Sequence, residues 1–374
     1  MLSRTTQIFI LLAMSLAIAP FVHAQSVDVN IGIFYDSLAP YGEWVQQPSY
    51  GWVWIPANVH PGWRPYTDGR WVYTDDYGWI YAADNQYGWA VYHYGRWAFD
   101  PYYGWFWVPG TVWAPAWVAW RHGNGYIGWA PLPPQVGWSM NAGLQLGRIN
   151  LNVGLDWDSW VFVENRWFDD PYINNHIAVP GRNVTIINIT NNVTNYTIIN
   201  NRIVNHSVRL EDIERETRRK VPRYKIMDLD IRSKERKYLM KGNTMQVFHP
   251  AIPDVKPKYA PKNVLPPRGP AQFNNYKKQL DTYQQQQQEQ LKKIHAQELK
   301  KVQQDNAAKQ KIEAQHQQEM LKLNEHMQRE KLVIENRQKN YQEQGQNKNQ
   351  DKINQNKKIQ DKNKERPEDK PKKK

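Results

Sequence analysis

Three gap-free repeats of an aromatic motif constrain the fold of this chain more than any other feature of its sequence. Each repeat has a glycine two residues before a tryptophan, and a Gly-Trp pair follows nine residues after that first glycine. The repeats begin at Gly42, Gly69 and Gly95 and therefore recur every 26–27 residues. A repeat of this length is one supersecondary unit that cannot bury its apolar face alone, so neighbouring units must share a core.

The local chemistry of each repeat predicts a β-hairpin. Side chains alternate between the two faces of a strand, so the Gly-Trp-x-Trp/Tyr stretch would place its rings on one face and Val53, Ile80 or Phe106 on the other. The connecting stretches contain Pro, Ser and Asp, which favour turns, and a glycine before the second tryptophan fits a positive φ. We expect residues 25–170 to form an antiparallel hairpin meander that closes into a small barrel or sandwich, without helices.

Composition divides the chain into an aromatic, acidic part and a basic part. All 18 tryptophans lie between Trp44 and Trp167, and no lysine precedes Lys220. The formal charge is −5 over residues 1–201, and it is +9 over each of the segments 202–270 and 271–374. The chain has no cysteine, which excludes disulfides, thiolate metal sites and a cysteine nucleophile.

The first 24 residues have the pattern of a secretory signal peptide. Arg4 precedes an apolar run from Ile8 to Ala19, and Val22-His23-Ala24 provides small residues for cleavage after Ala24. No later stretch approaches the roughly 20 apolar residues that a membrane-spanning helix needs. We therefore expect an exported protein of the bacterial periplasm or cell surface, with no transmembrane span after cleavage.

Three sets of residues resemble one known family. They are the YGxW and YGWxW pairs of the repeats, the run VPGTVWAPAWV over residues 108–118, and GWAPLPP over residues 128–134. In these motifs the chain is similar to bacterial exported Trp/Tyr/Gly-repeat proteins that carry a domain of unknown function. The resemblance covers roughly residues 33–170. It implies a β-rich exported domain and assigns no activity, cofactor or catalytic residue.

The many indole rings allow two interpretations. Repeated aromatic residues usually pack a core, and we expect packing for most of them. A domain of this size has difficulty burying every ring, and an exposed aromatic patch marks an interaction surface. The candidate binding residues are tryptophans outside the repeat register with their polar neighbours: Trp63 with Arg64, Trp89 with His93, and Trp120 with Arg121 and His122.

Motifs for catalysis are absent or lack the context they need. Residues 123–128 read GNGYIG, but the following WAPLPP cannot start the helix that a dinucleotide site requires, so a glycine-rich hairpin turn is expected. The histidines lack metal-site spacing. We therefore predict no enzyme activity, no metal and no cofactor. A glycan hydrolase, which would need two carboxyl groups about 5–10 Å apart, stays open as an alternative.

Three shorter segments precede the C-terminal tail. Residues 171–208 are Asn-rich, and NVTIIN at 183–188 recurs as NYTIIN at 195–200, which predicts one or two edge hairpins or an extended stalk. Residues 209–250 form a small basic α+β segment, with helices expected at 209–220 and 233–241 and a strand at 245–248. Residues 251–270 form a Pro-rich linker.

The remaining chain predicts one long helix and a disordered end. Residues 271–343 are rich in Gln, Lys and Glu, with apolar residues at intervals of three and four. They predict a long, solvated helix that pairs loosely, with a stable two-stranded coiled coil as the less favoured alternative because a strict heptad is absent. Residues 344–374 lack the apolar residues to form a core and are expected to be disordered.

These observations favour a non-enzymatic envelope or surface protein. Its basic helical tail would contact an anionic envelope polymer or self-associate through residues 271–343, without sequence-specific nucleic-acid binding. The first alternative is a module that binds cell-wall glycan through exposed tryptophans. The second is the glycan hydrolase.

Overall fold

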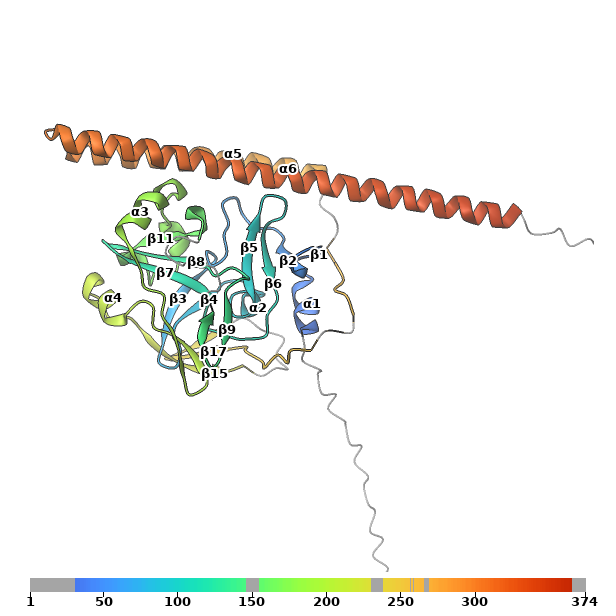
Figure 1. Ribbon diagram of the computed structural model, residues 1–374, viewed down its shortest axis with the longest axis horizontal. Coiled ribbons are helices and arrows are strands. Elements are labelled where there is room, and N and C mark those ends of the chain that lie inside the picture. Colours follow the sequence, from blue (N-terminus) through green and yellow to red (C-terminus); the bar gives the residue numbers. More distant parts are fainter. Residues whose placement is uncertain are drawn as a thin grey trace, which may run out of the picture.

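The computed structural model describes residues 31–145, 155–229, 238–255, 257, 259–265 and 269–364. A β-rich unit, here called the head (residues 31–248), carries two long helices that lie side by side across one of its faces (Figure 1). We call this pair of helices, α5 and α6, the arm. The expected signal peptide at residues 1–24 lies outside the described residues.

Each aromatic repeat forms an antiparallel hairpin, as the sequence predicts. The three hairpins are β1–β2 (Gly42–Gln47 and Gly51–Pro56), β3–β4 (Gly69–Thr74 and Gly78–Ala83) and β5–β6 (Arg96–Asp100 and Gly104–Val108). The glycine that opens each second strand has a positive φ, of +72°, +67° and +74° in Gly51, Gly78 and Gly104. A side chain would be strained there, which explains why the repeat has glycine at this position.

The hairpins do not follow one another in a single meander. The first and third share a four-stranded sheet of order β1-β2-β6-β5, joined where Trp54 pairs with Trp107. The second hairpin lies in a separate, seven-stranded sheet of order β13-β14-β4-β3-β15-β17-β16. Trp54 and Trp107 share one core with Trp79 of the second hairpin, so the ring faces of both sheets line that core. The expected meander is wrong because repeats with the same local pattern can bury their rings against a distant repeat as well as the next one.

A third sheet completes the head. It contains β7 (Val118–Gly123), β8 (Tyr126–Pro131), β11 (Val161–Glu164) and β12 (Asn191–Asn192) in the order β11-β8-β7-β12. The GNGYIG motif forms the β7–β8 turn, as predicted, with positive φ at Gly123, Asn124 and Gly125. A two-stranded sheet pairs β9 (Gly137–Ser139) with β10 (Gly143–Gln145).

The two Asn-rich hexapeptides adopt different secondary structures. NYTIIN contains β13 (Tyr196–Ile199), which pairs with β14 (Arg202–Asn205) in a hairpin on the head and not in a stalk. NVTIIN forms helix α3 (Asn183–Ile189), so the strand expected there is wrong. The buried Asn183 amide donates to the carbonyls of Trp157 and Trp160, contacts that Asn195 at the matching position does not make. Tertiary partners therefore decide between helix and strand for this pattern.

The basic segment after the hairpin is part of the head. Helix α4 (Leu210–Thr217) lies where a helix is expected, and β15 (Arg223–Asp228) and β17 (Thr244–Val247) extend the seven-stranded sheet. The helix expected at 233–241 is wrong at its end, because β16 (Leu239–Lys241) pairs with β17; residues 230–237 lie outside the described residues.

Short helical turns also occur in the part where no helix is expected. They are α1 (Gly32–Leu38), α2 (Gly88–Val91), and the 3₁₀ turns η1 (Trp157–Ser159), η2 (Asn165–Trp167), η3 (Ile173–His176) and η4 (Pro180–Arg182). Each contains three to seven residues, which is too short to produce a sustained 3.6-residue apolar period, so the sequence pattern does not reveal these turns.

The predicted long helix is a pair of antiparallel helices. Helix α5 (Pro270–Lys301) and helix α6 (Asn306–Lys364) are joined by residues 302–305 and pack along each other. The side chain of Asp305 accepts a bond from the backbone N–H of Ala308, which is the contact of an N-cap. Helix α6 continues beyond residue 344, where order is expected to end, and residues 365–374 lie outside the described residues. Among the described helices, none is both long and apolar enough to cross a bilayer.

The repeat tryptophans mainly fill the core, as predicted. All 18 tryptophans lie in the described residues, and none of them is exposed. Ten have almost no accessible surface: Trp44, Trp54, Trp71, Trp79, Trp97, Trp107, Trp117, Trp120, Trp129 and Trp160. Each buried indole removes about 150–250 Å² from water, so these rings are a major source of the stability of the head.

Candidate functional site

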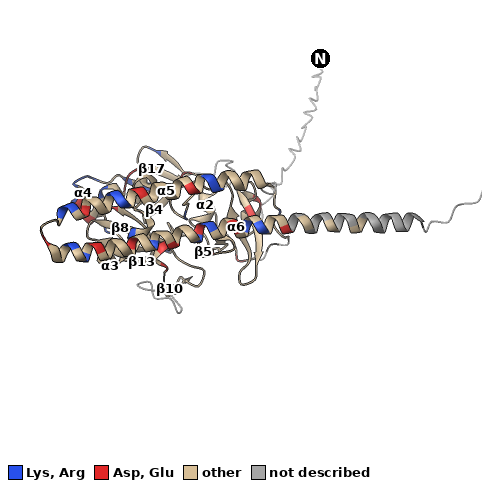
Figure 2. Cartoon of the chain, turned by 90° about the horizontal axis from the view of Figure 1, so that it is seen from above, with Lys and Arg blue, Asp and Glu red and all other residues tan. Residues whose placement is uncertain are grey.

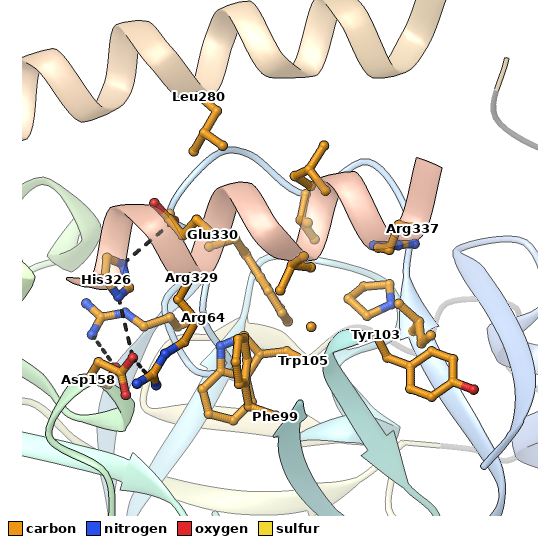
Figure 3. Close-up of a pocket in the computed structure, with 18 of the residues that line it drawn as sticks. Arg64, Phe99, Tyr103, Trp105, Asp158, Leu280, His326, Arg329, Glu330 and Arg337 are labelled. Atoms are coloured by element: carbon orange, nitrogen blue, oxygen red, sulfur yellow. Dashed lines mark hydrogen bonds and ion pairs between the residues drawn. The ribbon is translucent and has the colours of Figure 1, made fainter. Parts of the chain in front are cut away.

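A cavity of about 100 Å³ lies between the head and the arm. The head contributes a loop after β2 and the β5–β6 hairpin, and the arm contributes one side of each helix (Figure 3). One wall is apolar and the opposite corner is charged. The apolar wall includes Phe99, Trp105, Leu280 and Val333, and the charged corner consists of Arg64, Asp158, His326, Arg329 and Glu330.

Asp158, in the 3₁₀ turn η1, is the centre of the charged corner. Its carboxylate Oδ2 lies 2.6 Å from Nη1 of Arg329 and 3.7 Å from Nδ1 of His326, both on α6. Burial would raise the pKa of Asp158, but His326, Arg329 and Arg64 together hold that pKa below its usual value. Asp158 is therefore ionised at neutral pH and connects the head to the arm.

Arg64 supports the corner from within the head. Its Nη1 donates to the backbone carbonyls of Trp160, at 2.5 Å, and of Asp158, at 3.3 Å. Burial lowers the pKa of Arg64, and the nearby Tyr283, Asp158 and Glu330 oppose that effect. An arginine stays charged even so. Its Nε has no hydrogen-bond partner in the described residues.

His326 lies between two carboxylates without a close hydrogen bond to either. Its Nε2 is 3.7 Å from Glu330, and its Nδ1 is at the same distance from Asp158. Both ring nitrogens are buried and lack a hydrogen-bond partner in the described part of the chain. These contacts are long for hydrogen bonds, so the close bond between head and arm at this corner is the one from Arg329 to Asp158.

A second polar cluster holds the arm nearer to its closed end, the end at which residues 302–305 connect α5 to α6. It consists of His295 and Glu298 on α5 with His316 and Glu319 on α6, and we call it the His–Glu cluster. The pairs cross between the helices: His295 Nε2 lies 2.8 Å from Glu319, and His316 Nε2 lies 2.8 Å from Glu298. The two imidazole rings stack, with 3.7 Å between their centroids.

The head completes this cluster through the segment that contains η4 and α3. Arg182 Nη1 lies 2.8 Å from Glu298, and Thr185 Oγ1 donates to Glu319 at 2.6 Å. Glu298 and Arg182 stabilise each other's charge: the pKa of Glu298 is lowered and that of Arg182 is raised, although burial opposes both shifts. Each glutamate therefore bonds to a histidine of the arm with one oxygen and to the head with the other, and Oε1 of Glu319 also accepts from the amide of Gln315 on α6.

A third polar cluster lies toward the open end of the arm, the end at which α5 begins. Arg337 Nη2 donates to Glu43 of β1 at 2.8 Å, and the hydroxyl of Tyr341 donates to the other oxygen of the same carboxylate. The arm is thus attached by three polar clusters spread along its length, and single bonds run from Tyr276 to the carbonyl of His60 and from Asn336 to the carbonyl of Pro101. Apolar contacts also lie between them, such as those of Leu323 and Leu291 with Val179.

The seven predicted binding residues do not converge on one site. Trp63 and Arg64 line the cavity under the arm. Trp89 and His93 line a separate cavity of about 20 Å³ inside the head.

The third group, Trp120, Arg121 and His122, does not form an exposed surface, and Arg121 bonds to the end of α3. Trp120 is fully buried, and Arg121 donates to the carbonyls of Ile187 and Thr190, at 2.8 and 2.6 Å, near the C-terminal end of α3. A cation is favourable at a helix C-terminus. His122 lies 3.3 Å from Glu216.

The expectation that these residues form an exposed patch is wrong, because six of the seven are buried and His122 is partly buried. The physical reason is the repeat itself: with three sheets around one core, rings outside the repeat register find partners as well as those within it. Whether any of the seven binds a ligand stays a prediction.

Sequence reasoning missed the His–Glu cluster, although a signal was present. His295 follows Leu291 by four residues, and Glu319 precedes Leu323 by four, so polar residues occupy the apolar stripe of each helix. Such residues are expected to face a partner. Within the described residues, no group of three or more potential ligands is arranged to hold a metal ion.

Comparison with protein families shows one match. Residues 35–136 match a family of unknown function, DUF6600. The matched range contains all three aromatic hairpins and ends in the loop before β9, so it excludes the arm. Comparison with curated proteins and with solved structures returned no match.

Proposed function

We propose that this chain is a non-enzymatic exported protein of the bacterial envelope, in which the head is a scaffold that carries the arm and the arm binds an anionic envelope polymer. Export is supported by the signal-peptide pattern of the first 24 residues. The β-rich scaffold is supported by the match of residues 35–136 to a domain of unknown function and by the buried rings of the hairpins.

The observation that carries the proposal is the set of exposed lysines near the closed end of the arm. Lysine and arginine positions recur along both helices of the arm (Figure 2). Six exposed lysines lie between residues 292 and 311: Lys292, Lys293, Lys300, Lys301, Lys309 and Lys311. The same stretch contains two acidic residues, Glu298 and Asp305, and Glu298 is bound to Arg182 and His316. This end of the arm is therefore positively charged and suited to phosphate- or carboxylate-rich polymers.

The two alternatives receive less support from the geometry. A glycan platform needs accessible rings, whereas none of the tryptophans is exposed and ten of them have almost no accessible surface. A glycan hydrolase needs a carboxylic acid with a raised pKa, whereas the pKa of Asp158 in the cavity is lowered and its carboxylate is bound to Arg329.

Binding can be tested with two variants that remove equal charge. K292Q/K300Q/K301Q changes the end of the arm, and the control K225Q/K241Q/K262Q removes three exposed lysines elsewhere. The probes are vesicles with and without an anionic phospholipid and a soluble polyphosphate. We expect salt-dependent binding that falls about tenfold or more in the arm variant and little in the control. Equal losses in both variants, or no binding by the wild type, would refute the proposed role of the arm.

Export is tested separately. The mature N-terminus of the chain secreted from a bacterial host is sequenced, and the proposal requires cleavage after Ala24. Retention of the first 24 residues on a cytoplasmic protein would refute export while leaving the binding result unaffected.

A further inference from the structure

The two glutamates of the His–Glu cluster bond both to the histidines of the arm and to the head, so protonation of the histidines affects how the arm is held on the head. We propose that this cluster is a proton-sensitive latch, which holds the arm on the head near neutral pH and releases it in acid. The inference does not depend on which polymer the arm binds, or on its binding one at all. It rests on the arrangement of four arm residues and the two head residues that bond to them.

While the arm is docked, His295 and His316 cannot both be protonated without electrostatic repulsion. The imidazoles of His295 and His316 stack at 3.7 Å between centroids, so two imidazolium charges would repel each other at close range. His295, His316 and Glu319 are also buried, and Glu298 is partly buried. Burial, opposed by Glu319 and reinforced by His316, lowers the pKa of His295.

The head buries the His–Glu cluster. Gly181 of η4 lies against the backbone carbonyl of Glu319, and Val179 packs with Leu291 and Leu323 on either side. The charged and titratable groups that face the two histidines are Glu298 and Glu319 from the arm and Arg182 from the head, and Tyr126 of β8 lies close to the same charges. When the arm leaves, the imidazole of His295 returns to water and accepts a proton at the ordinary histidine pKa of about 6.5.

Acid weakens the docking of the arm. Below pH 6.5 the released arm binds more protons than the docked arm, so acid shifts the equilibrium toward release. The lowered pKa of Glu298 acts in the same direction at still lower pH. Each unit by which a docked pKa is lowered can weaken docking about tenfold. The other polar attachments include the ion pairs of Arg329 with Asp158, at 2.6 Å, and of Arg337 with Glu43, at 2.8 Å. The His–Glu cluster holds the part of the arm nearest the α5–α6 connection, so weakening it releases that end first.

Fluorescence energy transfer can measure docking, because the chain has no cysteine that would compete for labels. Labels are attached to Q303C, in the connection between α5 and α6, and Y172C, on an exposed site of the head. We expect transfer to fall between pH 7.5 and pH 5 in the full chain while the near-ultraviolet circular dichroism of the head stays native. G181L, whose side chain would collide with α6, provides the transfer value of a released arm.

The deciding variant is H295Q/H316Q, which keeps polar side chains that do not titrate. It should retain transfer down to pH 5, with the docking equilibrium at that pH at least about tenfold more favourable than in the wild type. The control H176Q removes a histidine of the head that also stacks on a ring, that of Trp167, and it should behave as the wild type. An equal loss of transfer in H295Q/H316Q and the wild type overturns the proposal, as does a loss that coincides with unfolding of the head.

A single variant keeps the test decisive if the double variant fails to dock at pH 7.5. H316Q removes the like charge beside His295, so His295 can accept a proton in the docked state. We expect the midpoint of release to move to lower pH, and an unchanged or higher midpoint overturns the proposal.

Discussion

Gly78, at the start of β4, has φ = +67° and lies directly against the backbone carbonyl oxygen of Asn205 in β14. This close approach joins the second aromatic hairpin to the Asn-rich hairpin, because the two strands pair at this position. The same repeat position in the first hairpin, Gly51, has φ = +72° and no atom within 4 Å of where a side chain would begin. The two glycines therefore have the same conformation in different surroundings.

These surroundings predict different costs for the same substitution. Gly51→Ala should lower the free energy of unfolding by about 1–2 kcal/mol, the cost of a left-handed backbone with a side chain. Gly78→Ala should cost clearly more, because its methyl group would overlap with Asn205 and separate β14 from β4. Urea denaturation of both variants measures the difference. Equal losses would mean that β14 adjusts without penalty and that the contact is not a constraint.

Gly181 should be a position where the arm can be detached without damage to the head. A methyl group there would overlap with the carbonyl oxygen of Glu319 and lie 2.9 Å from Cβ of Leu323, so Gly181→Ala should displace α6. Gly269→Ala is the matched control at the beginning of the arm, where nothing lies within 4 Å. Small-angle scattering should show a larger radius of gyration for Gly181→Ala alone, while thermal unfolding of the head is little changed. A compact Gly181→Ala variant would contradict this account of the interface.

His93 should make the head less stable in acid. Burial lowers the pKa of His93 to about 4, against a partial compensation from its bond to the carbonyl of Ala114. Below pH 6.5 the imidazole of His93 binds a proton in the unfolded chain, whereas in the folded head it stays neutral down to about pH 4. The free energy of unfolding therefore falls over that interval. The difference of pKa corresponds to about 3 kcal/mol. His93→Gln should remove most of this loss, as measured by urea denaturation followed by near-ultraviolet circular dichroism at pH 7 and pH 4.5.

His60 offers a comparison of opposite sign. Its bond to Asp68 raises the pKa of His60, so this histidine contributes stability below pH 6.5 that is lost as the pH rises through the raised value. His60→Gln should therefore make the loss of stability in acid steeper, whereas His93→Gln makes it shallower. A change of the same sign in both variants would contradict the assignment.

Arg96 should stabilise the head through its planar side chain as well as its charge. Its guanidinium lies 3.6 Å from the ring centroid of Trp117, and its Nε donates to the carbonyl of Val136 at 3.1 Å. Lysine cannot reproduce this stacked, directional contact, so Arg96→Lys should cost about 1–3 kcal/mol. Arg166→Lys is the control, since Arg166 is exposed and its guanidinium lies 5.2 Å from the ring of Trp167. Its expected effect is below about 0.5 kcal/mol, and comparable effects at both sites in chemical denaturation would argue against the stacking contribution.

Features that depend on neighbours in sequence could be predicted. The glycines at 51, 78 and 104 mark the turns of the hairpins because only their own backbone angle is involved. The arm was predictable as helix because its composition favours helix over many residues. Its division in two was not recognised, although Asp305 is a suitable N-cap, since a cap has a clear meaning only when a neighbouring helix provides a reason to turn.

The candidate site depended on contacts that no local pattern contains. Arg64 was selected for its position beside Trp63, and it does line the cavity, but its partners Asp158 and Trp160 are about 95 residues away. The His–Glu cluster likewise unites residues of two helices with Arg182 and Thr185 of the head. Their charges are near one another only because the arm folds back.

The sequence by itself determined the units of this protein: three aromatic hairpins, a basic segment and a helical C-terminal part, each set by side-chain alternation, glycine conformation or helix propensity over a short range. Tertiary structure alone decided that the first and third hairpins share a sheet, that NVTIIN is a helix while NYTIIN contains a strand, and that the arm docks through buried histidines. The physical reason is that burial and hydrogen bonding between distant residues contribute more free energy than the small local preferences that separate these alternatives.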